Sequence, residues 1–150
     1  MKRKMKDKVH LIAATLATLC IATFFTSTIL VELFGTPNWI ATVKGLIVSP
    51  GLFILIPTMA ITAATGFTLS KTRKGQWVTL KKKRMPYIGA NGLLILIPAA
   101  IFLDHLATEG AFNVKFYIIQ GVELLAGGIN LFLMGMNMRD GLKMKGKRRH

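Results

Sequence analysis

The stretch KTRKGQWVTLKKKR, residues 71–84, carries seven basic residues and no acidic one, and it lies between long apolar runs. Two further basic blocks occupy residues 2–8 and 139–149, so eighteen of the twenty Lys and Arg residues fall in three blocks. Basic residues in short loops stay on the cytoplasmic side of a membrane. The pattern therefore predicts that both termini and the segment 71–84 lie in the cytoplasm.

Four apolar runs lie between and beside these blocks. A helix needs about 20 apolar residues to cross the ~30 Å hydrocarbon core, and backbone groups in lipid must be hydrogen-bonded internally. The sequence therefore predicts an all-α membrane protein, a single domain formed by a four transmembrane helix bundle. The expected spans cover residues 9–33, 46–70, 85–105 and 114–138, with a basic loop at 71–84 and a basic tail at 139–150.

The segment before the second span carries two helix-start signals. Thr36-Pro37 is typical of an N-cap followed by a first helical residue, and Ser49-Pro50 repeats the signal. Residues 37–48 therefore form either a short interfacial helix at the outer surface or part of the second span. In the second case the helix is expected to kink near Pro50.

The formal net charge of +14 does not by itself indicate nucleic-acid binding. A nucleic-acid-binding protein is expected to gather basic residues on one face of a soluble domain, whereas these lie at helix ends. There they suit anionic lipid headgroups, at about 1 kcal/mol per basic residue near the surface. The expected partners are the bilayer and other membrane proteins or a second copy of the chain, and no nucleic acid.

One seam of the fourth span is polar, and its members are three or four residues apart, which directs them toward the bundle. The seam consists of Gln120, Glu123, Gly127, Asn130, Met134 and Asn137. Glu123 is the main candidate for a function, because a charge near mid-membrane costs roughly 2.5–3.5 kcal/mol and usually faces protein or water. We expect it to be protonated, to pair with Lys44 or Lys115, or to bond Gln120 or a threonine of the first span.

Two other features of the spans concern packing. Asn91 is expected to hydrogen-bond Asn130 across the bundle, and both join Glu123 and Gln120 as ligand- or proton-binding candidates. Beside the polar seam, Gly121, Gly128 and Gly135 recur every seven residues and would let a neighbouring backbone come close. Lipid-facing positions are then left to Phe116, Ile119, Leu125 and Phe132.

The outer ends of the spans carry further polar residues, Glu32, Asp104, His105 and Glu109. Carboxylates and imidazole can bind cations, but the spacing matches no metal motif, so we expect a solvated polar cluster and no metal site. Haem is a weak candidate cofactor, because His10 and His105 lie at opposite ends of their spans. His–Met ligation stays open, because the chain has eight methionines, including Met85 and Met138 near the inner side.

No catalytic set is recognisable, and the expectation leans against an enzyme. The sequence favours a small polytopic protein of the bacterial inner membrane, a non-enzymatic accessory or assembly subunit of a membrane complex. One alternative is an oligomeric carrier or binding protein for a small molecule, proton or cation, which uses the Glu123 carboxylate. A weaker alternative is a haem- or quinone-binding electron-transfer protein.

Overall fold

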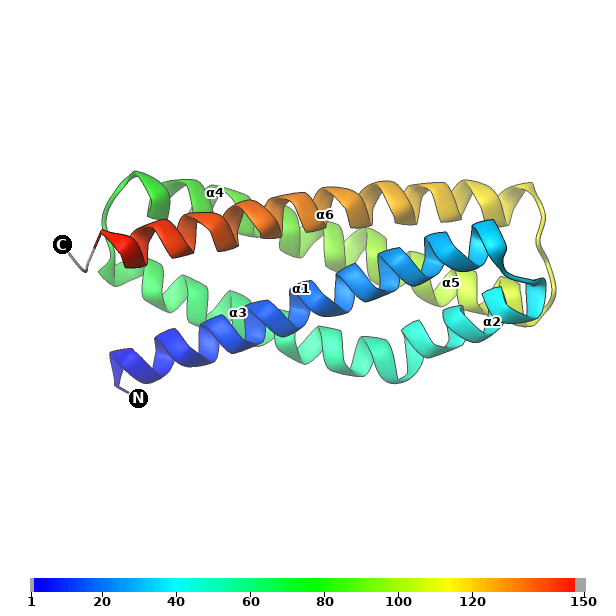
Figure 1. Ribbon diagram of the computed structural model, residues 1–150, viewed down its shortest axis with the longest axis horizontal. Helices are drawn as coiled ribbons and strands as arrows, with labels where there is room; N and C mark the ends of the chain where they lie inside the picture. Colours follow the sequence, from blue (N-terminus) through cyan, green and yellow to red (C-terminus); the bar gives the residue numbers. More distant parts are fainter. Residues whose placement is uncertain (1, 148–150) are drawn as a thin grey trace.

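Four long helical arms run side by side in the computed structural model, which describes residues 2–147 (Figure 1). The first arm is α1 (Arg3–Phe34), and the second joins α2 (Pro37–Leu46), η1 (Ile47–Leu52) and α3 (Phe53–Thr72). The third joins α4 (Gln76–Asn91), η2 (Gly92–Leu96) and α5 (Ile97–Thr108), and the fourth is α6 (Val114–Gly146). Each arm is long and apolar enough to cross a membrane, which indicates an integral multi-pass membrane protein.

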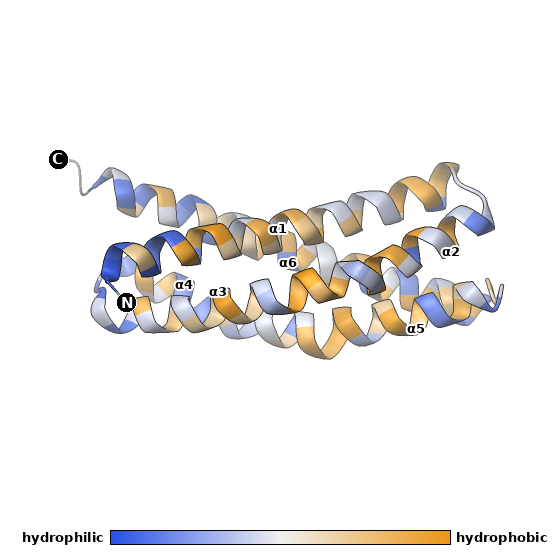
Figure 2. Cartoon of the chain, turned by 90° about the horizontal axis from the view of Figure 1, so that it is seen from below, coloured by the Kyte–Doolittle hydropathy of each residue, from blue (hydrophilic) through white to orange (hydrophobic). Residues whose placement is uncertain are grey.

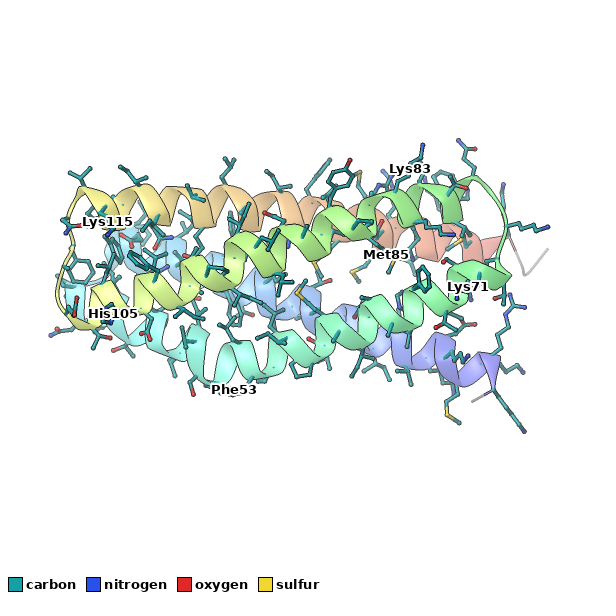
Figure 3. The ribbon with its side chains drawn as sticks, turned by 180° about the vertical axis from the view of Figure 1, so that it is seen from behind. Phe53, Lys71, Lys83, Met85, His105 and Lys115 are labelled. Carbon is teal, nitrogen blue, oxygen red and sulfur yellow. The ribbon has the colours of Figure 1, made fainter. Side chains whose placement is uncertain are left out.

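The two ends of the bundle differ in charge. Both termini lie at one end, together with the connection between α3 and α4 (Figure 1). We call it the basic end, because the three basic blocks meet there. The opposite, distal end holds the turns after α1 and α5. Figure 3 shows Lys71 and Lys83 toward the basic end and His105 and Lys115 toward the distal end. Mainly apolar helix surface lies between the ends (Figure 2).

The second arm bends at Ser49, and this bend decides between the two interpretations of residues 37–48. Ser49 has an extended backbone (φ −140°, ψ 113°) and precedes Pro50, as expected because proline disfavours a helical residue before it. Thr36 caps α2 by accepting the Trp39 N–H at 3.4 Å. Lys44 in α2 is buried in the bundle, so α2 belongs to the second arm and is not a separate surface helix.

Two segments expected to be loop or tail are largely helical. Only residues 73–75 separate α3 from α4, so most of the expected loop 71–84 extends the second and third arms. Helix α6 also continues to Gly146, well into the expected tail 139–150. The Asp140 carboxylate is fully buried and accepts hydrogen bonds from Arg84 at 2.6 Å and Arg139 at 3.3 Å, which fastens this part of α6 to α4. Residues 148–150 of the predicted tail lie outside the described residues.

The polar seam of α6 faces the bundle, as expected. Gln120, Asn130 and Met134 are buried, whereas Leu125 and Phe132 face outward. Phe116 contradicts the sequence expectation, because it is fully buried rather than lipid-facing. It lies one helical turn before Gln120 and therefore on the same face as the seam, where it packs in an apolar cluster with Ile40 and Leu103.

The bend of the second arm is tightly packed at Gly51, and this packing yields a test. A Cβ on Gly51 would lie 2.7 Å from the Phe24 ring and 2.9 Å from the Leu46 carbonyl oxygen. We expect Gly51→Ala to lower the free energy of unfolding by about 1–3 kcal/mol, the usual cost of overpacking. An SDS titration in mixed micelles would measure it. The control is Gly121→Ala, which meets no atom within 4 Å; an equal loss there would contradict the packing argument.

Candidate functional site

A buried ion pair joins the second and fourth arms in the distal half of the bundle. The Lys44 ammonium lies 2.6 Å from a Glu123 carboxylate oxygen, and the Lys44 side chain is 0% exposed. Of the two lysines expected as partners for Glu123, Lys44 forms the ion pair. Lys115 lies on the surface, with its ammonium 4.9 Å from the centre of the Phe102 ring. A charge buried in an apolar bundle is tolerated when it is paired and hydrogen-bonded, and both members meet this condition.

Neutral polar groups complete the surroundings of the pair. Gln120 donates a hydrogen bond from its side-chain amide to Glu123 at 3.0 Å, and Lys44 donates to the Thr28 hydroxyl at 3.5 Å. Gln120 is 3% exposed, and its amide oxygen has no hydrogen-bond partner. A small cavity of about 40 Å³ borders Glu123, which is large enough for a water molecule. Three helices, α1, α2 and α6, therefore meet at one polar site.

Asn91 and Asn130 make a second polar contact, nearer the middle of the bundle. The Asn91 amide donates to the Asn130 side-chain oxygen and to the Ala126 carbonyl, both at 2.8 Å. Asn130 is fully buried and donates to the Ile88 carbonyl at 3.4 Å. The expected hydrogen bond across the bundle is thus present. These mutual bonds lock α4 to α6, while a ligand-binding role for the two residues stays a prediction.

The polar residues expected to cluster at the outer ends separate into two groups. His105 is 68% exposed and lies 3.4 Å from Glu109, one turn along the same helix. Glu32 instead has a buried carboxylate oxygen without a hydrogen-bond partner, and Asp104 faces α2, where its carboxylate would lie 3.6 Å from a Cβ on Gly45. Within residues 2–147 no three His, Cys, Asp or Glu side chains gather as a metal site would require.

The glycine seam beside the polar seam is not used within the chain. A Cβ on Gly121 or Gly135 would meet no atom within 4 Å, and one on Gly128 would only touch the Phe25 ring. In the polar seam, by contrast, a Cβ on Gly127 would lie 3.4 Å from the Phe25 ring of α1. Close packing of another backbone along Gly121, Gly128 and Gly135 therefore needs a partner outside this chain.

A large cavity lies at the basic end, a feature that the sequence analysis did not predict. It has a volume of about 680 Å³ and is lined by all four long arms. In Figure 1 the ribbons of α1 and α6 diverge toward the basic end. The inner wall is apolar and rich in methionine, a flexible side chain that suits adaptable binding surfaces. Five of the eight methionines line it, namely Met59, Met85, Met134, Met138 and Met144. This concentration of Met was the signal available in the sequence.

The rim of this cavity is basic. Arg73 forms an ion pair with Asp7 across the opening, yet its Nε–H is buried and has no partner. Lys81 is half-buried, lines the cavity and forms none of the ion pairs found among the described residues. A buried donor that lacks an acceptor costs about 1–3 kcal/mol. An anionic group at this rim would supply an acceptor for the Arg73 Nε–H.

The positions of His10 and His105 test the expectation that the protein binds haem. His10 lines the cavity, and its ring nitrogen Nδ1 lies 2.9 Å from the Thr65 hydroxyl. A Cβ on Gly66 would meet both the His10 ring and the Met85 thioether, so these two side chains lie close together. His105 lies at the other end of the bundle (Figure 3). Bis-histidine ligation by this pair is thus sterically excluded, and His–Met ligation stays a prediction.

Comparisons with protein families, with curated proteins and with solved structures found no significant match. Function therefore has to be inferred from the two sites themselves, the polar site around Lys44 and Glu123 and the cavity at the basic end.

The buried ion pair is expected to behave as a coupled unit. Lys44→Met leaves the Glu123 carboxylate without its cation and should lower the free energy of unfolding by about 3–5 kcal/mol. Glu123→Gln should lower it by less, because the Glu32 carboxylate, one turn beyond Thr28 on α1, then pairs with the Lys44 ammonium. The double variant removes both charges and should recover most of this loss. A double-mutant cycle in SDS titrations would measure the coupling. Lys115→Met, which changes an exposed lysine, is the control; additive single losses would contradict the pairing.

Proposed function

We propose that the protein is a membrane-embedded binding protein for an amphiphile with an acidic head group, held in the cavity at the basic end. The single observation that carries the proposal is the combination of a methionine-rich apolar wall with a basic rim in one 680 Å³ cavity. Ligand pockets for small molecules span about 300–1,000 Å³ and are mostly apolar with a few placed polar groups. This cavity fits that description.

The acidic head is assigned to the rim and the apolar chain to the depth of the cavity. Arg73 offers a buried N–H without an acceptor, and Lys81 offers an ammonium group without a carboxylate partner. Charge-assisted hydrogen bonds to phosphate or carboxylate oxygens are stronger than neutral ones. Below them, Leu11, Met59 and Ile88 form part of a wall that matches an acyl or prenyl chain.

The proposed setting is the inner membrane of a bacterium, with the basic end in the cytoplasm. The positive-inside rule supports this orientation, because the three basic blocks converge on one end. In that orientation the cavity opens at the level of the cytoplasmic headgroups. Anionic lipids are therefore the most abundant ligands of the proposed chemistry within reach.

The orientation can be tested by labelling single cysteines in intact cells. In a Cys20→Ala background, Glu109→Cys at the distal end should react with a membrane-impermeant maleimide, whereas Lys74→Cys at the basic end should react only after permeabilisation. Both positions are exposed in the protein, so accessibility to the reagent depends on the side of the membrane. The reverse pattern of labelling would contradict the proposed orientation.

Ligand binding can be tested by native mass spectrometry. The delipidated protein is mixed with equal amounts of phosphatidylglycerol and phosphatidylcholine, and we expect it to retain phosphatidylglycerol preferentially. Arg73→Gln combined with Lys81→Gln should weaken this retention about tenfold or more, since each basic residue contributes about 1 kcal/mol at a lipid headgroup. The control is Lys82→Gln with Lys83→Gln, which removes two exposed charges from the same helix outside the cavity.

A second matched pair of variants tests the apolar wall. Ala63→Trp places a large side chain in the cavity and should reduce lipid retention, whereas Ala64→Trp adds the same side chain at the next position, outside the cavity lining. Equal retention of phosphatidylcholine, or equal effects of both members of either pair, would contradict binding in this cavity.

An accessory or assembly role is the second candidate function. The observation that favours it is the open glycine seam of α6, where a Cβ on Gly121 or Gly135 would meet no atom of the other described helices within 4 Å. Small residues of this kind let helices of different chains pack closely in lipid. Native mass spectra of the protein extracted from its own membranes separate the two roles. Stoichiometric partner chains would support the accessory role, and a lipid adduct on the protein alone would support the binding role.

A further inference from the structure

The polar site in the distal half contains more carboxyl groups than cations. Glu32 from α1 and Glu123 from α6 are the carboxyl groups beside Lys44 on α2, and Glu123 lies 2.6 Å from the Lys44 ammonium. Asp104 of α5 instead lies against Gly45 on α2. Glu32 lies one turn along α1 from Thr28, whose hydroxyl accepts a hydrogen bond from Lys44 at 3.5 Å. The other titratable groups of these arms at this end, His105, Glu109 and Lys115, are exposed. Lys44 is therefore the one buried cation that the described residues supply to this site.

Helix geometry places the two side chains with an unpaired oxygen, Glu32 and Gln120, at the same level along the bundle. Glu32 follows Thr28 by one turn on α1, which runs toward the distal end. Gln120 precedes Glu123 by about one turn on α6, which runs the opposite way. Both Glu32 and Gln120 therefore lie one turn distal to the ion pair. Each presents a buried side-chain oxygen that lacks a hydrogen-bond donor.

The unpaired oxygens of Glu32 and Gln120 lack a hydrogen-bond donor, and the second carboxylate lacks a positive charge to balance it. Lys44 can neutralise one carboxylate, and it lies 2.6 Å from Glu123. A second ionised carboxylate beside it would leave net negative charge and unpaired acceptors in an apolar bundle, both of which are costly. A proton on one carboxyl group removes the excess charge and turns an acceptor oxygen into an O–H donor.

We propose that Glu32, Lys44 and Glu123 form a proton-binding site that holds one exchangeable proton. The proton resides on Glu32 when Lys44 pairs with Glu123, and on Glu123 when Lys44 pairs with Glu32. Lys44 stays an ammonium throughout, and the proton is taken from and returned to water at the distal end, with no redox step. This site is separate from the cavity at the basic end and does not depend on the proposed lipid ligand.

Infrared spectroscopy of the protein in nanodiscs tests the proposal directly, because a protonated carboxyl group has a carbonyl stretch well separated from that of a carboxylate. The chain has only six Asp and Glu side chains, and Asp7 and Asp140 are paired with arginine. At neutral pH we expect one protonated-carboxyl band that shifts in D2O. Both Glu32→Gln and Glu123→Gln should abolish it, because the carboxylate that remains then pairs with Lys44.

Control variants define the outcomes that would overturn the proposal. Glu109→Gln and Asp104→Asn should keep the band, and circular dichroism should show that every variant retains its helical content. Absence of the band from the unmodified protein would overturn the site, because both carboxylates would then be ionised. A band that persists in Glu123→Gln would overturn the exchange between the two residues, because Lys44 would then not pair with Glu32.

Discussion

The ion pair between Lys44 and Glu123 is the constraint on which the distal half of the bundle depends. Each partner would be costly alone in an apolar bundle, so together they require α2 and α6 to meet at one level. Lys44 can reach that level because the second arm bends at Ser49, which separates α2 from α3. The bend, the close packing at Gly51 and the ion pair are therefore parts of one arrangement.

This arrangement divides the molecule into a closed half and an open half. Apolar clusters around Phe116 and around Ile21, together with the Asn91–Asn130 bond, hold the arms together from the distal end to the middle of the bundle. Toward the basic end α1 still packs along α3, and ion pairs at the rim, Asp7 with Arg73 and Asp140 with Arg84, join further parts of the chain. These pairs bridge neighbouring helices but leave space between them, which is the cavity.

Features governed by the bilayer could be predicted from the sequence. The number of arms, the convergence of the basic blocks and the inward face of Glu123 follow from length, charge and periodicity, which are local properties. The limits of the helices were less predictable, because α6 extends past Gly141 only through the burial of Asp140 against Arg84 of another arm. Phe116 was misassigned although it continues the spacing of the polar seam, because large apolar residues are usually placed toward lipid.

The candidate sites depend on distances between arms, which the sequence does not contain. It offered both Lys44 and Lys115 as partners for Glu123, and the bend in the second arm decided between them. It grouped Glu32 with His105, although Glu32 turns into the bundle and His105 remains on the surface. The cavity requires the divergence of α1 from α6, of which the concentration of methionines was only an indirect sign.

An exposed apolar side chain needs no special explanation in a protein that crosses a bilayer, because lipid covers it. The informative groups are those that neither lipid nor the fold satisfies. At the basic end this group is the Arg73 guanidinium, which has a buried donor and an apolar cavity beside it. At the distal end it is the Glu32 carboxylate, which has a buried acceptor one turn from the Thr28 hydroxyl that contacts Lys44. The first lacks an anion and the second lacks a proton. Because one group requires an anion and the other a proton, we assign an anionic ligand to the basic end and a proton to the distal end. Neither proposed site depends on the other.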